Sequence, residues 1–421
     1  MDWRVKPEAT SLNQKPDVTR SEPASADRLI ALDILRGLAV AGMILAVGPG
    51  DWSQVYPPLR HAEWNGATMT DMVFPTFLFS VGMALGLGFS RGMAEPGAQA
   101  RVWRRVLRRS ATLIVFGLLI EASYTLSIAL GAASPGGGGL ADIRLPGILQ
   151  RIGVCYALAA ALLIFTARKR EDGRFEIDLM QVSAVIGAVL VGYWAVLRFV
   201  PAPGLGAWRL DPAGNLPGYV DRLVFGVSHL WPLGSASASP PATYDPEGLL
   251  STLPATTNVL FGALAATLLR RQRPSALGRL AIAGIVLVSA GLLLDPFFPI
   301  NKRLWTSSFA LLSSGVSTLL LVALIALPQG FARGPLLAPL RVLGGNAILA
   351  FLTCTLMSRV ASFAFLPGAA GRETPQAWGD HLALHLLPDP KLASLACAVG
   401  VLATVTVVLW PLHKRAIHFR L

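Results

Sequence analysis

The sequence contains few charged residues. Only 14% of its 421 residues are charged and 53% are hydrophobic, whereas soluble domains carry about 25% charged residues. This imbalance excludes an ordinary soluble protein. Cysteine is also scarce: Cys155, Cys354 and Cys397 lie within apolar stretches, and their odd number implies no disulfide framework. The cysteines lack metal-ligand spacing, and His381 and His385 have no third ligand nearby in sequence, so we predict no metal site.

Long apolar runs recur along the whole chain. A membrane-spanning helix needs about 20 apolar residues, and ten runs are of that order. We therefore predict an all-α, polytopic bundle of about ten transmembrane helices. Gly and Pro inside several runs argue against uniformly straight helices. The runs cover approximately residues 30–49, 67–89, 108–131, 146–166, 179–200, 250–269, 280–298, 305–327, 341–363 and 392–412.

Basic residues are distributed unevenly between the connections. The formal net charge of +12 could suggest a nucleic-acid partner, but Lys and Arg concentrate in alternate loops, around residues 91–109, 168–174 and 270–279, and at the C-terminus. By the positive-inside rule, this pattern places both termini in the cytoplasm and the loop with His61 on the opposite, periplasmic side. We predict a multi-pass protein of the inner (plasma) membrane, in contact with membrane lipid and without a nucleic-acid partner.

The chain divides into a tail and one membrane domain. Residues 1–27 are polar and Pro-containing, without the apolar core of a cleaved signal peptide. We predict that they form a disordered cytoplasmic tail. Residues 28–421 show no clear internal repeat and no separable soluble part, and we predict a single transmembrane domain.

Two charged residues lie in the first apolar run. A charge inside a spanning helix costs about 2.5 to 3.5 kcal/mol, so such residues normally face a cavity or a partner. Asp33 and Arg36 are three residues apart, on one helical face near the cytoplasmic end of the run. They either form an internal ion pair, or Arg36 meets an anionic ligand that enters from the cytoplasm.

A short polar segment leads into the second run. The stretch HAEWNGATMTD contains His61, Glu63, Trp64, Asn65 and Asp71. Asp71 follows His61 by ten residues, about 15 Å along a helix. Each residue alone could be a surface or structural group. Together they favour a functional segment, because imidazole is the side chain best suited to exchange a proton near neutral pH.

Polar residues also open two later runs. Arg144, Gln150 and Arg151 lie at the start of the fourth run, where Pro146 suits the beginning of a helix. Asn346 starts the ninth run, where structural hydrogen bonding and ligand contact are both open.

Charged and amide residues lie in the external connections. Asp221, Asp245 and Glu247 occupy the long connection at about 201–249, although Asp245 followed by proline is also a good helix N-cap. Asn301 and Lys302 belong to a basic cluster on the side that should be poor in positive charge. Such a cluster predicts an acidic partner or an anionic substrate.

Seven motifs together resemble the heparan-alpha-glucosaminide N-acetyltransferase family and its bacterial relatives. They occur in the family's order over about residues 28–412, and they read LDILRG, HAEWNGATMTDMVFPTFLFSVG, RLPGILQRIGVCY, YVDRLVFGVSHL, YDPEGLLSTLP, NKRLWTSSF and GGNAI. The resemblance implies an enzyme that takes an acetyl (acyl) group from cytoplasmic acyl-CoA and transfers it to an amino sugar or related glycan on the periplasmic side. Acetyl-CoA is then a co-substrate.

The resemblance also guides the assignment of residues. The family's active-site histidine corresponds to His61, and the carboxylate of its T-D-x-V-F-P motif corresponds to Asp71, so we predict both to be catalytic. The residues that we expect to contact acyl-CoA are Asp33, Arg36, Arg144, Gln150, Arg151 and Asn346. Those that we expect to contact the acceptor are Glu63, Trp64, Asn65, Asp221, Asp245, Glu247, Asn301 and Lys302.

Some alternatives stay open. Relatives commonly carry Asn near the end of the first run, where this chain has Ala46, Val47 and Gly48. The chemistry allows a covalent acyl-histidine or a direct transfer, and the family allows a homodimer, for which the sequence has no signal. The rival class is a transporter or flippase of a saccharide or lipid-linked saccharide, with the intramembrane charges as its substrate or proton sites.

Overall fold

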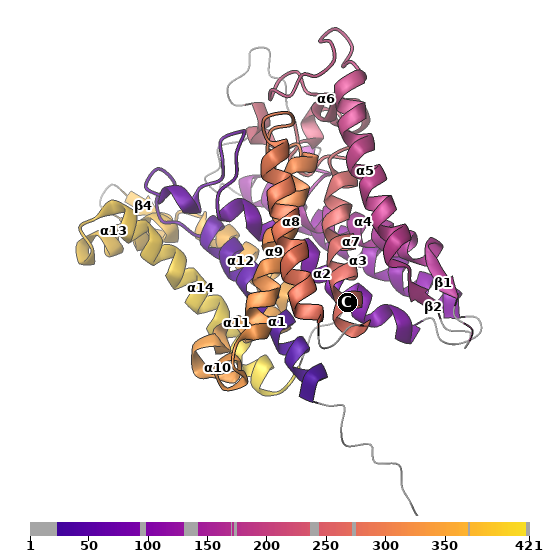
Figure 1. Cartoon of the computed structure of the whole chain (residues 1–421). Coiled ribbons are helices and arrows are strands. Elements are labelled where there is room, and N and C mark those ends of the chain that lie inside the picture. Colours follow the sequence, from indigo (N-terminus) through magenta and orange to yellow (C-terminus); the bar gives the residue numbers. More distant parts are fainter. Residues whose placement is uncertain are drawn as a thin grey trace, which may run out of the picture.

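A computed structural model of the chain describes residues 23–92, 98–129, 142–169, 171, 175–235, 244–271, 275–368 and 371–417. Its regular structure is almost entirely helical (Figure 1). The described strands form two short hairpins, β1 (Ala167–Lys169) with β2 (Phe175–Ile177) and β3 (Leu366–Gly368) with β4 (Gly371–Glu373). Residues 1–22 of the predicted tail lie outside the described residues, and α1 begins at Pro23.

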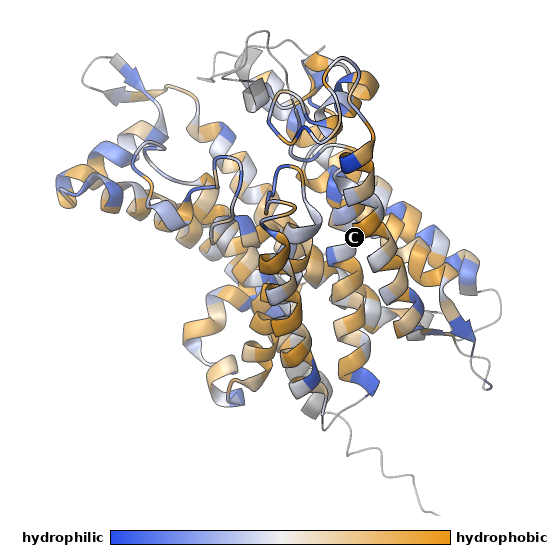
Figure 2. Ribbon diagram, turned by 45° about the horizontal axis from the view of Figure 1, so that its top comes forward, coloured by the Kyte–Doolittle hydropathy of each residue, from blue (hydrophilic) through white to orange (hydrophobic). Residues whose placement is uncertain are grey.

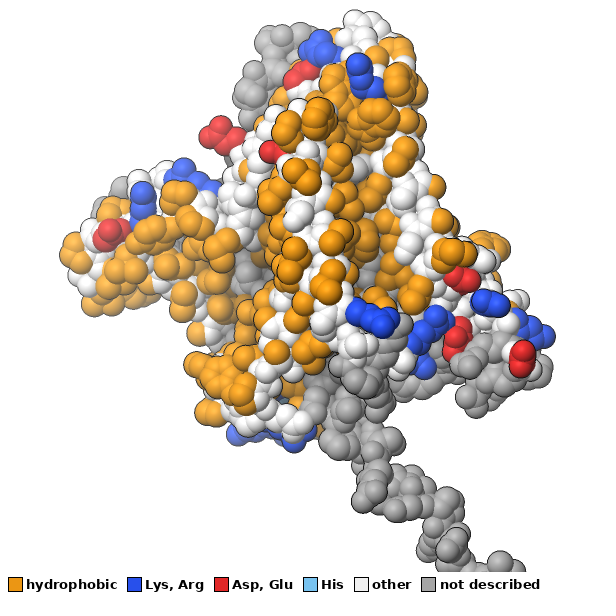
Figure 3. Space-filling view, viewed as in Figure 1, with side chains coloured by type: hydrophobic (Ala, Val, Ile, Leu, Met, Phe, Trp, Pro, Cys, Tyr) orange, Lys and Arg blue, Asp and Glu red, His pale blue; other side chains and the backbone are white. Residues whose placement is uncertain are grey.

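Nine helices of the described residues are long and apolar enough to cross a membrane. This finding confirms the predicted all-α, polytopic membrane fold. Hydrophobic side chains cover the flanks of the bundle (Figure 3) and polar residues gather in the loops (Figure 2), as a lipid surrounding requires. The nine are α1 (Pro23–Val47), α2 (Val73–Gly92), α3 (Ala98–Ala129), α4 (Ile148–Phe165), α5 (Leu179–Phe199), α7 (Thr252–Arg271), α8 (Ala276–Leu294), α9 (Ser307–Ala326) and α14 (Pro390–Lys414).

The ninth predicted run is a broken helix. The segment Pro335–Gly345, which contains α11 (Ala338–Gly345), meets α12 (Ala347–Ala361) at an angle of 86°. Asn346 occupies the break. A Cβ atom on Gly344 would lie 1.8 Å from the backbone oxygen of Asp33, so only glycine lets α11 pack this closely on α1. Counted as one span, this bent pair brings the number to the ten that the sequence predicts.

Close helix contacts hold the centre of the bundle together. A Cβ atom on Gly82 of α2 would lie 1.8 Å from the backbone oxygen of Val259 in α7. Small residues at helix interfaces let the backbones approach closely. Helices in lipid commonly pack in this way, because lipid provides no hydrophobic driving force between them. Leu78 and Phe309 are fully buried beside this contact, in the core cluster that α2, α4, α7 and α9 share.

The bundle has two distinct ends. The start of α1 and the end of α14 lie at one end, together with α10 (Gln329–Arg333) (Figure 1). We call this the terminal end. The opposite end, called the His61 end, carries α6 (Leu216–Phe225), α13 (Pro375–Leu386) and the short helices η1 (Pro57–Leu59), η2 (Thr70–Met72), η4 (Val227–His229) and η5 (Pro232–Ser235).

Candidate active site

The loop before α2 folds back on itself and brings His61 onto Asp71. Residues 60–69 are not helical, and the Nδ1 atom of His61 lies 2.7 Å from Oδ1 of Asp71. Ten residues therefore do not separate the two groups by the 15 Å of a continuous helix. Asp71 closes the loop: its Oδ2 atom accepts hydrogen bonds from the backbone N–H groups of Ala62 and Thr68, at 3.0 and 2.9 Å, and from the Thr68 hydroxyl.

This hydrogen-bond network assigns the tautomer of His61. Three donors converge on Oδ2 of Asp71, which favours an ionised carboxylate. Because a carboxylate only accepts hydrogen bonds, Nδ1 of His61 carries the hydrogen and donates it to Oδ1. In the neutral ring, Nε2 then holds the lone pair, and the described residues offer it no hydrogen-bond partner. A carboxylate that orients an imidazole in this way is the arrangement of acyl-transfer triads.

Lys302 completes this group from a different part of the chain. Its Nζ atom lies 3.0 Å from Nδ1 of His61 and 3.4 Å from Oδ1 of Asp71. Since Nδ1 already donates to Asp71, the ammonium group of Lys302 is paired with the carboxylate. Burial lowers the pKa of Lys302, and the negative charge of Asp71 opposes this change.

Buried contacts position the segment that carries Lys302. Trp305 adopts a positive φ of 51°, and its Nε1 atom donates to Oδ1 of Asn258 at 2.9 Å. The guanidinium of Arg151 lies over the indole ring, 5.2 Å from its centroid. Nδ2 of Asn301 donates to Oδ1 of Asn65 at 3.1 Å and so joins this segment to the His61 loop. Asn65, Arg151 and Asn301 therefore support the site from behind it.

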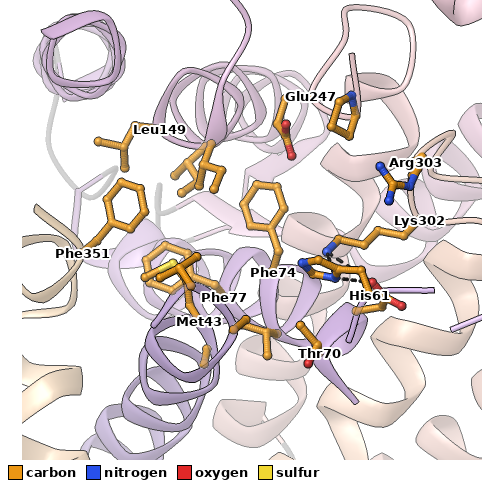
Figure 4. Close-up of a pocket in the computed structure, with 18 of the residues that line it drawn as sticks. Met43, His61, Thr70, Phe74, Phe77, Leu149, Glu247, Lys302, Arg303 and Phe351 are labelled. Atoms are coloured by element: carbon orange, nitrogen blue, oxygen red, sulfur yellow. Dashed lines mark hydrogen bonds and ion pairs between the residues drawn. The ribbon is translucent and has the colours of Figure 1, made fainter. Parts of the chain in front are cut away.

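A cavity of about 330 Å³ begins at this group and extends into the bundle. Its walls come from α1, α2, α4 and α12. Figure 4 shows His61 and Lys302 together on one side of the cavity, and Met43, Phe77 and Phe351 on the other. The lining residues on α1 run from Ala39 to Val47, about 12 Å of helix. The site is therefore one polar group at the mouth of a mainly apolar channel.

Arg144 holds three carboxylates at the same mouth. It makes a bidentate contact with Asp245, with Nε to Oδ2 at 2.8 Å and Nη2 to Oδ1 at 2.6 Å, and it also contacts Glu247. Its Nη1 atom lies 3.8 Å from Oε1 of Glu121. Burial disfavours the charged guanidinium, but the carboxylates outweigh burial and raise the pKa of Arg144. Arg144 and Glu247 line the cavity, whereas Asp245 is buried behind them.

Aromatic rings surround the outer part of the mouth. Trp64 and Trp231 line the cavity, and each packs edge-on against Tyr244, at centroid distances of 5.0 and 6.0 Å. Arg303 donates a hydrogen bond to the Tyr244 hydroxyl at 2.8 Å and lies 5.2 Å from the Trp231 ring centroid. Trp231, Tyr244 and Arg303 were not among the predicted site residues. The basic run NKR was the available signal for Arg303.

Several predicted residues do not line the cavity. Asp33 and Arg36 form an ion pair of 3.8 Å, one helical turn before Ala39 on α1. Glu63 is exposed. Asp221 is buried and accepts the backbone N–H of Leu249 at 2.8 Å.

Two further predicted residues, Gln150 and Asn346, donate hydrogen bonds to backbone oxygens. Gln150 is buried and donates to the Leu145 oxygen at 3.2 Å, and Asn346 donates to the Ile417 oxygen at 3.1 Å. Neither of them is among the described residues that line the cavity. In the described part of the chain, no group of three or more His, Cys, Asp or Glu side chains is arranged to hold a metal ion.

Comparisons of the sequence with known proteins show which family the chain resembles. Residues 28–171 match the model of the catalytic part of heparan-alpha-glucosaminide N-acetyltransferase. The chain is 30% identical over 335 residues to heparan-alpha-glucosaminide N-acetyltransferase of Mus musculus and 29% identical over 330 residues to that of Homo sapiens. These matches support the heparan-alpha-glucosaminide N-acetyltransferase family as the family of the chain. These alignments cover 71% and 70% of this chain but 48% of each relative, so the chain spans about half the length of the curated relatives it matches.

The matched part of the family contains most of the site. Residues 28–171 include α1, α2 and α4, which wall the cavity, and also His61, Asp71 and Arg144. Lys302 and Glu247 approach from outside this range. The part of the chain that matches the family model therefore forms one side of the cavity. Segments after residue 171 form the other side.

Proposed function

We propose that this protein is a membrane acetyltransferase that transfers an acetyl (acyl) group from cytoplasmic acyl-CoA to an amino sugar or related glycan on the periplasmic side. The observation that carries the proposal is the position of the oriented His61–Asp71 pair, at the mouth of a channel that enters the bundle. The family of the chain supports the type of reaction. The distribution of basic residues supports the two sides of the membrane.

The shape and lining of the channel suit the acyl donor. The pantetheine arm of CoA is slender and moderately polar, whereas its phosphates do not enter hydrocarbon. An arm in the channel would pass Val40, Met43 and Phe77 and bring the thioester to His61. The phosphates would remain toward the terminal end, where Arg36 is a candidate partner because arginine makes bidentate contacts with phosphate.

His61 has the lone pair that either chemical route needs. In direct transfer, the acceptor ammonium first loses one proton to solvent, and Nε2 then takes a second proton from the neutral amine as the amine nitrogen attacks the thioester carbonyl carbon. The carbon–sulfur bond then breaks, and the proton passes to the departing CoA thiolate. In the two-step route, Nε2 itself attacks the thioester carbonyl carbon and forms an acyl-imidazolium, the carbon–sulfur bond breaks, and CoA leaves as the thiolate, which takes a proton from the acceptor ammonium. The neutral amine then attacks the acyl carbon, the bond from this carbon to Nε2 breaks, and Nε2 takes the proton that the amine nitrogen loses. In both routes, Asp71 stabilises the imidazolium that forms.

The mouth of the cavity suits a cationic, ring-shaped acceptor. An amino sugar is protonated before it reacts, and Glu247 is a cavity-lining carboxylate in a cluster of three carboxylates around Arg144. The faces of Trp64 and Trp231 offer apolar surfaces on which a sugar ring can stack. Lys302 and Arg303 at the same mouth would accommodate an acidic group on the acceptor.

The proposal is tested with purified protein, labelled acetyl-CoA and glucosamine as the acceptor. Wild-type protein should transfer the label, and His61→Ala should reduce kcat by about 10³-fold, within the range for loss of a general base or nucleophile. His385→Ala is the matched control, because His385 is an exposed histidine at the same end and does not line the cavity. Equal activity of all three proteins would remove His61 from the chemistry.

A second readout separates this function from transport. An enzyme should bind acetyl-CoA and transfer its label in detergent solution, where no membrane divides two compartments. Saccharide flux across vesicles without any acetyl-CoA, together with no transfer in detergent, would instead favour a transporter. The two-step route predicts that wild-type protein retains the labelled acetyl group when no acceptor is present. The His61→Ala variant should retain none.

A further inference from the structure

A second cavity, of about 970 Å³, lies beside the β1–β2 hairpin, which connects α4 to α5. Its other wall is the last turn of α7. Figure 1 places the hairpin away from α6, at the lower right side of the bundle. The residues that line this cavity are mainly charged or polar, and none of them lines the cavity at His61.

Specific contacts build this cavity. Nη2 of Arg271 donates to the Ile177 oxygen at 2.7 Å and to Oε2 of Glu176 at 2.8 Å, and it thereby attaches the hairpin to the end of α7. Asp178 caps α5 by accepting the backbone N–H groups of Met180 and Gln181, at 3.0 and 3.1 Å. Two acidic residues of the lining are therefore engaged within the protein.

Two basic residues of the lining remain available to a ligand. Arg168 and Lys169 are exposed on β1, and within the described residues neither side chain makes a hydrogen bond or an ion pair. Glu171 is the remaining acidic residue of the lining. The lining as a whole has four basic residues, Arg168, Lys169, Arg270 and Arg271, against the three acidic residues Glu171, Glu176 and Asp178. The cavity therefore has an excess of positive charge.

The surroundings of the cavity are those of a membrane surface. Phe165, the last residue of α4, and Met180, in the first turn of α5, are 78% and 79% exposed. They adjoin the hairpin and continue into the hydrophobic flank of α5, where Val191 is also exposed. The distribution of basic residues predicts that this end faces the cytoplasm, where the leaflet contains anionic lipids.

We propose that the hairpin cavity binds the phosphate headgroup of an anionic phospholipid. Arg168 and Lys169 contact the phosphate, and the acyl chains extend past Phe165 and Met180 along α5. The apolar rim distinguishes a lipid from a soluble phosphate or nucleotide, because only a lipid uses the charged wall and the exposed apolar residues together. Bound lipid would hold the α4–α5 connection at the headgroup level.

The test is retention of phosphatidylglycerol by the full-length protein. The protein is purified from phosphatidylcholine nanodiscs with and without phosphatidylglycerol, and native mass spectrometry counts the lipid that remains bound. Wild-type protein should retain phosphatidylglycerol in preference to phosphatidylcholine. The double variant Arg168→Gln/Lys169→Gln should retain about 25-fold less, since each basic residue near an anionic lipid surface contributes about fivefold. Arg168→Lys keeps the charge and should retain phosphatidylglycerol.

A matched control removes the same charge elsewhere. Arg372→Gln/Lys391→Gln neutralises two exposed basic residues on the α13–α14 side of the molecule and should leave lipid retention unchanged. Equal retention by wild-type protein and Arg168→Gln/Lys169→Gln would overturn the proposal. Displacement of the bound lipid by inorganic phosphate or by free CoA would also overturn it, in favour of a soluble phosphate ligand.

Discussion

The cavity at His61 and the cavity at the β1–β2 hairpin use charge in opposite ways. At His61, the buried carboxylate of Asp71 is held by an imidazole, two backbone N–H groups, a hydroxyl and Lys302. At the hairpin, Arg168 and Lys169 are exposed and unpaired within the described residues. Fixed, desolvated partners can preorganise a reaction. Exposed, unpaired charges attract an anion without directing any chemistry.

The largest expected difference between the two regions concerns turnover. Asp71→Asn should lower kcat by about 10³- to 10⁴-fold, because an amide at this position can donate to Nδ1 and turn the imidazole to the other tautomer. The same change in the hairpin region, Asp178→Asn, keeps a residue that caps helices well and should leave kcat within about twofold. Labelled acetyl transfer measures both. Equal losses would mean that Asp71 has only a structural role.

The next difference concerns stability. Arg144→Gln leaves three carboxylates around a partly buried site without their cation and should destabilise the protein by about 3 to 5 kcal/mol. Arg271→Gln removes the half-exposed pair with Glu176, which is worth about 1 kcal/mol or less. Arg144→Lys should recover only part of the loss, since lysine cannot make the bidentate contact with Asp245. The free energy of unfolding of each variant is measured in detergent. Equal losses of stability in Arg144→Gln and Arg271→Gln would contradict the comparison.

The smallest difference concerns pH and a buried acid near the His61 cavity. Burial raises the pKa of Asp221 from 3.8 to about 7. A folded-state pKa above the unfolded value means that Asp221 favours folding at low pH and that this contribution is lost as the pH rises to about 7. Between pH 5 and pH 8 the loss is about 3 kcal/mol at most.

Asp221→Asn is the variant that isolates this effect. The amide stays neutral, so thermal unfolding of Asp221→Asn should change less between pH 5 and pH 8 than that of wild-type protein. Asp211→Asn is the control, because Asp211 is a more exposed carboxylate paired with Arg209 shortly before α6 in the chain. Identical pH dependence of wild-type protein and Asp221→Asn would show that Asp221 does not titrate in this range.

Hydropathy predicted the number and position of the spans, but it did not predict the sharp bend within the ninth. The run at 179–200 corresponds to α5, Leu179–Phe199, because length and apolar composition are all that a lipid-facing helix requires. The run at 341–363 is equally apolar, yet the chain turns by 86° at Asn346. The turn follows directly after Gly344, which packs against the α1 backbone at Asp33. A contact of this kind joins distant segments and leaves no periodic signal in the local sequence.

The sequence singled out the polar pair at the cavity mouth better than the apolar residues of the cavity wall, and the catalytic role of the pair stays a prediction. Motifs predicted His61 and Asp71, but the loop that closes their 2.7 Å contact depends on backbone hydrogen bonds that no spacing rule describes. Phe74 and Phe351 line the cavity, and as apolar residues in apolar helices they carried no signal of this role. Arg151 was predicted to contact acyl-CoA, whereas its guanidinium lies over Trp305 and binds the Gly248 oxygen.

A structure of the full chain with a non-hydrolysable acetyl-CoA analogue is the most direct test of the central claim. The analogue should fill the channel between α1, α2, α4 and α12, with its acyl carbonyl carbon about 3 to 3.5 Å from Nε2 of His61. Its nucleotide should lie toward the terminal end. An analogue bound outside this channel, or a thioester separated from His61 by the wall that contains Phe74, would contradict the proposed transfer at His61.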